Sequence, residues 1–227
     1  MKPYVILHNA VSLDGRINNF PLNLELYYGL AAGFGEDATL AGCDTLLAGM
    51  AKWLETEEEA IASSTDDSKH PETRPLLVVP DSRGRMKAWE RLLRQPYWRG
   101  GVSLCTDATP GEHREYLTRV GVEALSVGER HVDYPRALEE LGRRLRVKYM
   151  RMDSGGTLNG LLLREGLIDE ISLLVHPTLV GDTDPGSIFH NPDPSSPASP
   201  VSLDLKSCQT LEGGYLWLRF LVKGTKT

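Results

Sequence analysis

Two adjacent glycines between a predicted strand and a predicted helix are the feature of the sequence that most directly predicts chemistry. The strand Val147–Met152 leads to Gly155 and Gly156, and a helix is predicted over Thr157–Glu165. Because glycine has no Cβ, a phosphate can approach the backbone closely, and the unpaired N–H groups of the first helical turn point towards it. The segment predicts a site for a nucleotide phosphate. The alternative is a tight strand-to-helix turn without a ligand.

Polar residues near the end of the first predicted strand form a second candidate site. Asn9 lies in the strand Tyr4–Val11, and Asp14 follows it in the turn Ser12–Gly15. Ligands of open α/β sheets gather beyond the carboxyl ends of parallel strands. Asp-Gly is also a favourable turn sequence, so this segment is consistent with a ligand contact, with a purely local turn, or with both.

A hydroxyl and two guanidinium groups follow another predicted strand. Ser82, Arg83 and Arg85 come directly after the strand Pro75–Val79 and the pair Pro80-Asp81. Fork-like donors at that position suit the 2′-phosphate that distinguishes NADP from NAD. A solvated turn is the alternative.

Two other patterns indicate no site. The string G-x-G-x-x-A at Gly33–Ala38 closes an amphipathic helix and precedes a strand, which reverses the order that a dinucleotide-binding turn requires. It therefore predicts a helix end. The six histidines contain no i,i+4 pair and the three cysteines no C-x-x-C pair, so neither a metal site nor a disulfide is predicted. His8 and His176 are expected as core or interface residues of apolar strands.

The composition is that of an ordinary globular protein. The chain has 227 residues, of which 41% are hydrophobic and 25% charged, and a formal net charge of −6. No apolar run reaches the roughly 18 residues of a membrane span. The net negative charge of the chain produces no long-range positive potential that would attract nucleic acid or anionic lipid. We therefore expect a cytoplasmic protein without a signal peptide that binds a small molecule, with no nucleic-acid or membrane partner.

Strands and helices alternate along most of the chain, which predicts βαβ crossovers and a largely parallel sheet with helices on its faces. An acidic, Ser/Thr-rich stretch over Glu55–His70 is expected to be an exposed connection or a short solvated helix. The predicted strands are Tyr4–Val11, Thr39–Gly42, Pro75–Val79, Gly101–Thr106, Val122–Val127 and Val147–Met152. The predicted helices are Leu22–Phe34, a short helix capped by Asp44 or Thr45, Ala88–Arg94, Glu112–Val120, Pro135–Leu145 and Thr157–Glu165.

The last third of the chain changes character. A strand over Glu170–His176 is followed by a Pro/Ser-rich loop over Thr183–Pro200. Two further strands, Val201–Leu211 and Tyr215–Val222, are joined by Glu212-Gly213-Gly214 and predict an antiparallel hairpin at one edge of the sheet. The fold class is therefore a mixed, mostly parallel α/β structure. Residues 1–227 are expected to form a single domain.

Four segments in this order resemble a known family. They read NAVSLDGRI, AGCDTLLAG, GGTLNGLLLREGLIDEISLLVHPTLVGD and LEGGYLWLRFLV. They are similar to the reductase domain of riboflavin biosynthesis, the carboxy-terminal half of bifunctional deaminase-reductases. The resemblance covers nearly the whole chain, and no deaminase zinc motif is present. It implies a dihydrofolate-reductase-like, three-layer α/β/α fold, NADPH as the cofactor and a homodimer. Tyr215, Trp217 and Phe220 of the final hairpin offer an apolar surface for the dimer or, alternatively, belong to the core.

The resemblance also implies roles for individual residues. Thr45 matches a threonine near the nicotinamide end of the cofactor, and the nicotinamide itself is expected against Asn9 and Ala10. The loop that holds the pyrophosphate matches Ser154, Gly155, Gly156, Thr157 and Leu158. The residues that receive the adenosine 2′-phosphate match Asp81, Ser82 and Arg83.

Two departures from the family concern the substrate. Where the family carries an Asp-x-Pro-x-Leu stretch followed by an arginine, this chain reads Gly49–Leu54, with Lys52 as a candidate for a substrate phosphate or carboxylate or as a solvated lysine. Where the family has Glu before the glycines, this chain has Ser154, with Asp153 one place earlier. Neighbouring strand residues point to opposite faces of the sheet. Asp153 is therefore a candidate substrate contact, but its side chain should point to the opposite face from the family's Glu, which stands at the position of Ser154.

The reaction implied by the resemblance is hydride transfer from NADPH to C1′ of a ribosylamino-pyrimidine phosphate. The protein's task in such a reaction is mainly positioning and electrostatics. Asp14 is the candidate proton donor, with an ordered water as the alternative. The competing functions are reduction of another small carbonyl or pterin-like compound by the same fold, and nucleotide binding without catalysis.

Overall fold

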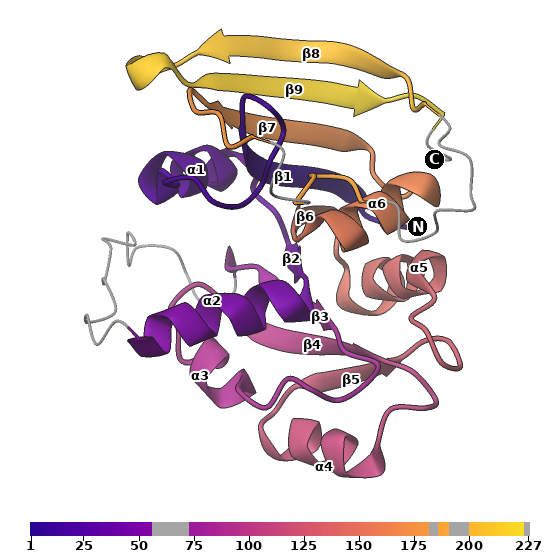
Figure 1. Ribbon diagram of the computed structural model, residues 1–227. Coiled ribbons are helices and arrows are strands. Elements are labelled where there is room, and N and C mark those ends of the chain that lie inside the picture. Colours follow the sequence, from indigo (N-terminus) through magenta and orange to yellow (C-terminus); the bar gives the residue numbers. More distant parts are fainter. Residues whose placement is uncertain (56–72, 182–185, 191–199, 225–227) are drawn as a thin grey trace. The chain divides into compact units, whose positions relative to one another are not determined.

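The structure is a computed structural model that describes residues 1–55, 73–181, 186–190 and 200–224 (Figure 1). From residue 56 on, the predicted acidic connection lies outside the described residues, and so does most of the predicted Pro/Ser-rich loop. The chain divides into two compact units, one of Met1–Pro3 with Glu36–Lys148 and one of Tyr4–Gly35 with Tyr149–Thr227. The expectation of one domain over residues 1–227 stays a prediction.

The first unit is built on a parallel sheet with the strand order β5-β4-β3-β2. Strands β2, β3 and β4 are almost entirely buried, as expected of parallel strands covered by helices. The strands are β2 (Ala38–Ala41), β3 (Leu76–Pro80), β4 (Gly100–Cys105) and β5 (Glu123–Ser126). The helices are α2 (Cys43–Glu55), α3 (Trp89–Leu93), α4 (Gly111–Arg119) and α5 (Tyr134–Leu145).

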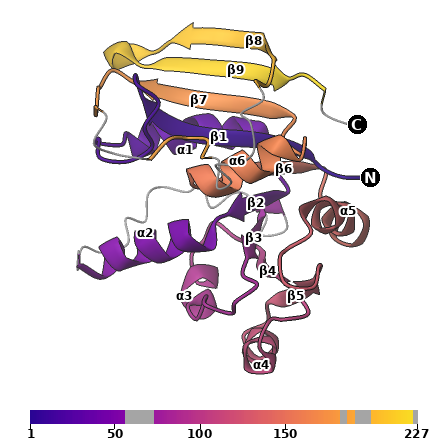
Figure 2. The same cartoon turned by 45° about the vertical axis from the view of Figure 1, so that its right-hand side comes forward.

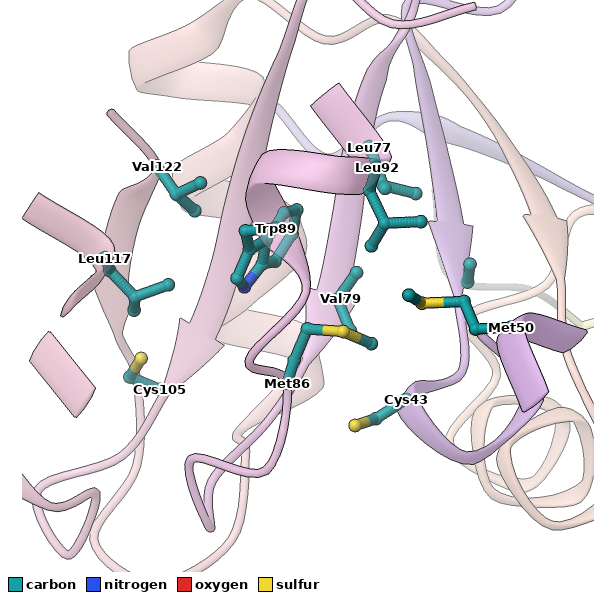
Figure 3. Packing of buried hydrophobic residues seen from close by; sticks show 11 residues of the cluster. Cys43, Met50, Leu77, Val79, Met86, Trp89, Leu92, Cys105, Leu117 and Val122 are labelled. Carbon is teal, nitrogen blue, oxygen red and sulfur yellow. The ribbon is translucent and has the colours of Figure 1, made fainter. Parts of the chain in front are cut away.

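Trp89 lies at the centre of the apolar core of this unit. Its side chain is fully buried and packs among Met86, Leu117 and Val122, which come from a loop, from α4 and from the approach to β5 (Figure 3). The facing strand carries Gly101, where a Cβ would lie 2.7 Å from the indole ring. The glycine therefore makes room for the tryptophan against β4.

The second unit is built on a mixed sheet with the strand order β6-β1-β7-β9-β8. The pairs β1/β6 and β1/β7 are parallel, whereas β7/β9 and β8/β9 are antiparallel. The strands are β1 (Tyr4–Ser12), β6 (Tyr149–Asp153), β7 (Glu170–His176), β8 (Leu203–Thr210) and β9 (Leu216–Val222). The helices are α1 (Leu24–Ala31) and α6 (Gly156–Arg164) (Figures 1 and 2).

Helices α1 and α6 cover opposite faces of this second sheet. Side chains of neighbouring strand residues point to opposite faces. His8 stacks on Tyr27 of α1, with ring centroids 4.4 Å apart, whereas its neighbour Asn9 is hydrogen-bonded to Asn159 of α6. The second unit therefore has the three layers α/β/α.

Most predicted elements are confirmed within a few residues of their ends. The mixed, mostly parallel sheet and the carboxy-terminal antiparallel hairpin are present. The string Gly33–Ala38 ends a helix, because α1 passes into a 3-10 turn that closes at Gly35 with φ 61°. Among the described residues, no helix is both long enough and apolar enough to cross a membrane.

The prediction for α2 was wrong in two respects. The helix begins at Cys43, so Asp44 and Thr45 lie inside its first turn and neither is the cap. The amide of Leu46 donates instead to the carbonyl of Gly42, 3.0 Å away. The helix is also 13 residues long rather than short. Its main chain is therefore helical throughout Gly49–Leu54, where the family carries its proline-containing substrate stretch.

Candidate cofactor and substrate site

A buried network of amide and hydroxyl groups joins the carboxyl ends of β1 and β6 to α6 in the second unit. The Asn9 amide nitrogen donates to the carbonyl of Ser154 at 3.1 Å, and the Asn159 amide nitrogen donates to Asn9 Oδ1 at 3.0 Å and to the carbonyl of Ile188 at 3.0 Å. Ser154 Oγ donates to Asn159 Oδ1 at 2.6 Å. All three side chains are buried. Asn9 and Ser154, both predicted to bind the cofactor, thus direct these side-chain atoms into the protein.

Sequence reasoning missed Asn159. The only signal was an asparagine inside the leucine-rich helix GTLNGLLLR. A buried amide keeps its place in such a helix only when its polar atoms are hydrogen-bonded, and the network above satisfies this requirement.

The first turn of α6 fits the predicted phosphate site. Gly155 is the N-cap residue, and no side chain caps the helix there. Gly155 and Leu158 are partly exposed and Thr157 is exposed, so a ligand can reach this turn. The first amides of a helix have no intrahelical acceptor and lie at the positive end of its dipole. The turn can therefore hold an anion such as a diphosphate.

The reason for a glycine at position 156 differs from the predicted one. A Cβ on Gly156 would lie 2.1 Å from the carbonyl oxygen of Ser187, and a Cβ on Gly160 would lie 2.2 Å from that of His190. The amide of His190 also donates to the carbonyl of Gly156 at 2.9 Å. The glycine at 156 therefore admits the backbone of residues 187–190 rather than a phosphate.

Asp14 is held at the surface of the second unit by several donors. Its Oδ1 accepts from Ser12 Oγ at 2.7 Å and from the amide of Val180 at 3.2 Å, and its Oδ2 accepts from the amide of Gly181 at 2.9 Å. These hydrogen bonds, led by that of Ser12, lower the pKa of Asp14 to about 2. The carboxyl group is therefore ionised near neutral pH, which weighs against its predicted role as proton donor.

Asp153 lies on the face of the sheet that α1 covers. The Arg151 side chain, which is buried in the same strand, donates from Nη1 to Asp153 Oδ2 at 2.9 Å. Both charges act on the neighbouring Tyr27, whose pKa is raised, chiefly by burial and then by Asp153. Ser154 belongs to the α6 side, so the predicted difference in direction between residues 153 and 154 is confirmed. Ala10, on the α1 side, packs with Tyr27 and Leu174 in an apolar cluster.

The turn after β3, in the first unit, is shaped by Asp81. Its buried carboxylate accepts from the amides of Arg85 at 2.9 Å and Met86 at 2.8 Å, so the side chain faces inwards. The carbonyl of Ser82 accepts from Thr109 Oγ1 at 2.9 Å. Arg83 is exposed, and it offers a guanidinium group to a ligand.

Other predicted residues of the first unit have more ordinary surroundings. Arg85 donates from Nη1 to Asp44 Oδ1 at 2.7 Å, so this guanidinium already has a carboxylate partner. Thr45 is exposed in the first turn of α2. The main chain of Lys52 lies in the same helix, and its side chain is outside the described residues.

The second sheet has a helix on each face, and an open helix start follows one of its strands. Together with the mostly parallel strands, this arrangement is typical of α/β proteins that bind nucleotides. The model of the RibD C-terminal domain family matches residues 3–217. The chain belongs to this family, which confirms the resemblance to the reductases of riboflavin biosynthesis.

Two relatives are both named 2,5-diamino-6-ribosylamino-4(3H)-pyrimidinone 5′-phosphate reductase. The protein from Methanothermobacter thermautotrophicus is 28% identical over 230 residues, which cover 99% of this chain and 100% of that protein. The protein from Archaeoglobus fulgidus is 31% identical over 193 residues, which cover 81% of this chain and 84% of that protein.

Solved structures show the same fold. RibD of Acinetobacter baumannii gives a TM-score of 0.72 at 24% identity, covering 98% of this chain and 58% of that longer chain. The riboflavin biosynthesis reductase Rib7 of Saccharomyces cerevisiae gives a TM-score of 0.64 at 16% identity, covering 97% and 90%. The expected dihydrofolate-reductase-like fold is confirmed.

Proposed function

We propose that this protein is an NADPH-dependent reductase of riboflavin biosynthesis. Its substrate is 2,5-diamino-6-ribosylamino-4(3H)-pyrimidinone 5′-phosphate or 5-amino-6-(5-phosphoribosylamino)uracil. One observation carries this proposal. Nearly the whole chain matches the full length of the Methanothermobacter thermautotrophicus protein, which is named as the reductase of the first of these two compounds.

The reaction converts the ribosylamino group to a ribitylamino group. In the ring-opened form C1′ is double-bonded to nitrogen; C1′ gains a hydride, the nitrogen takes a proton, and the double bond becomes single. NADPH, when bound, supplies the hydride and leaves as NADP⁺. The protein must orient the two reactants and exclude water from the reacting atoms.

The described residues support these tasks separately in each unit. In the second unit, the first-turn amides of α6 from Gly155 to Leu158 would hold the diphosphate, and Ala10 would lie beside the nicotinamide. Asp153, fixed by Arg151, is the carboxylate available to donors on the substrate. In the first unit, Ser82 and Arg83 would receive the adenosine 2′-phosphate and Thr45 would contact the cofactor.

A second candidate substrate class has its own supporting observation. Helix α2 runs from Cys43 to Glu55 without a break and contains no substrate aspartate of the family type. A chain altered in this way could reduce another small carbonyl or pterin-like compound with the same cofactor. The two candidates share the fold and the cofactor and differ only in the substrate.

Spectroscopy of the purified protein tests the proposal. Titration by fluorescence compares NADPH with NADH, and we expect tighter binding of NADPH. Loss of NADPH absorbance is then followed with each of the two pyrimidine phosphates, and mass spectrometry must find a product heavier by two hydrogens. Binding of NADPH without turnover of either compound would replace this proposal with the second candidate or with a binding protein.

The same family membership supports a homodimer. Strand β8 is exposed along most of its length, and the side chains of Leu203 and Leu205 are among its exposed residues. Exposed apolar residues along an edge strand are typical of an interface. Analytical ultracentrifugation of the wild-type protein and of Leu205→Lys should give a dimer and a weakened dimer, respectively.

A further inference from the structure

Two segments at the carboxyl edge of the second sheet are joined to each other. The β1 turn (residues 13–17) follows β1, and the β7 segment (residues 177–181) follows β7. The amide of Leu13 donates to the carbonyl of Thr178 at 2.8 Å. Strands β1 and β7 are parallel neighbours, so both segments leave the sheet at the same edge.

The carboxylate of Asp14 forms the second link between these segments. Its two oxygens accept from consecutive amides of the β7 segment, those of Val180 at 3.2 Å and Gly181 at 2.9 Å. Gly181 has a φ of 94°, a conformation that favours glycine. Consecutive amides turned towards one anion form a nest, and a charged acceptor strengthens each hydrogen bond.

Each of the two segments carries a large apolar side chain next in sequence to a residue of the Asp14 contact. Leu13 is 64% exposed and Leu179 is 70% exposed, although both follow deeply buried strands. A ligand that bound against leucines with this exposure would remove them from water, and this burial would stabilise the complex. Hydride transfer to an imine carbon also requires that water be kept away from the reacting atoms.

We infer that Asp14 is a positioning residue whose carboxylate clasps the β1 turn to the β7 segment, so that Leu13 and Leu179 together form an apolar cover over the reacting end of the cofactor site. This inference rests on the proposed function for what is covered. The clasp itself rests only on contacts of the free protein. Asp14 therefore acts through the two leucines and transfers no proton.

Hydrogen exchange of the free protein tests the clasp without any substrate. Asp14→Ala should speed amide exchange at Val180 and Gly181 by about tenfold or more, because two charge-assisted hydrogen bonds are lost. Glu140→Ala, which removes a partly exposed carboxylate from α5, is the matched control and should leave these amides unchanged. Unchanged exchange in Asp14→Ala would overturn the clasp, whether or not the protein reduces a pyrimidine.

Kinetics of a mutant cycle test the role of the cover. Leu13→Ala with Leu179→Ala should raise KM for the pyrimidine and lower kcat, while NADPH affinity stays the same. If Asp14 acts through the leucines, adding Asp14→Ala to that double variant should change kcat less than twofold. A further drop of about a hundredfold, as expected on removal of a general acid, would overturn the inference. Asp14→Glu should recover part of both the exchange protection and kcat.

A wild-type protein that binds NADPH but turns over neither pyrimidine would refute the proposed function and leave the exchange result standing. An intact reductase whose exchange does not respond to Asp14→Ala would refute the clasp alone. The two failures are therefore distinguishable.

Discussion

Gly156 and Ser187 approach each other so closely that a Cβ on the glycine would lie 2.1 Å from the serine carbonyl oxygen. Gly160, one helical turn later, has the same relationship with His190, at 2.2 Å. The backbone of residues 187–190 therefore packs directly against the face of α6 that carries these glycines. A backbone carbonyl cannot move out of the way as the end of a flexible side chain can. Positions 156 and 160 therefore accept no side chain larger than the hydrogen of glycine.

Gly156→Ala is expected to destabilise the protein by about 3 kcal/mol, because the new methyl group must displace the 187–190 backbone. Gly29→Ala in α1 is the matched control. A Cβ there meets nothing within 4 Å, so alanine should stabilise the helix by about 0.5–1 kcal/mol. Urea unfolding of both variants measures the difference. Equal stabilities would contradict the close approach.

Thr157 offers a cleaner test of the diphosphate site than Gly156 does, because its side chain is exposed. Thr157→Glu should stabilise the protein by about 0.5 kcal/mol through the helix dipole. It should also weaken NADPH binding about tenfold or more, because the carboxylate repels the diphosphate. Thr157→Gln is the uncharged control for both measurements. NADPH affinity that is equal in the two variants would place the diphosphate elsewhere.

Glu170 joins four strands of the second unit. Its fully buried carboxylate contacts Lys206 Nζ at 2.7 Å, the Tyr4 hydroxyl at 3.1 Å and the Arg219 guanidinium. Burial, together with Glu170, raises the pKa of Tyr4 to about 12. Glu170→Gln removes the charge that balances the cations and should cost about 3 kcal/mol.

The partly exposed pair Glu140–Arg143 is the control for this prediction, since Glu140→Gln in α5 should change stability little. Thermal unfolding at matched pH compares the two variants. Similar melting temperatures for Glu170→Gln and the wild type would show that the buried cluster contributes no net stability.

Local sequence patterns were enough to predict most of the fold. The strand Glu170–His176 was predicted with its observed ends, and the others within a few residues, because apolar runs bounded by turn residues record burial directly. The predicted helix end at Gly33–Ala38 relied on the same kind of local signal. Helix α2 was predicted only as a short helix capped by Asp44 or Thr45, whereas it runs over Cys43–Glu55.

The site was less predictable, since its contacts join residues far apart in the sequence. Asp14 accepts hydrogen bonds from amides 166 and 167 positions away, and such backbone donors leave no mark in the sequence. The Gly-Gly pattern did locate the open start of α6. It could not show that Gly156 makes room for Ser187, because the partner is a backbone atom of an irregular segment.

His8 should make stability depend on pH in the acid range. Its ring is buried between Ser172 and the Tyr27 carbonyl, and burial, with the nearby Arg151 cation, lowers its pKa from 6.5 to about 4. Between these two values the unfolded chain binds a proton that the folded protein does not. The stabilisation is therefore complete above about pH 6.5 and is lost as the pH falls towards about 4.

The expected contribution of His8 is a loss of about 2 kcal/mol between about pH 7 and about pH 5. Other buried histidines add to the total, since burial also lowers the pKa values of His113 and His176. The quantity to measure is therefore the difference between the wild type and His8→Gln in urea unfolding at both pH values. Glutamine does not titrate, so this variant should lose less stability on acidification than the wild type does. Parallel losses in the two proteins would mean that the imidazole of His8 is protonated equally in the folded and unfolded states.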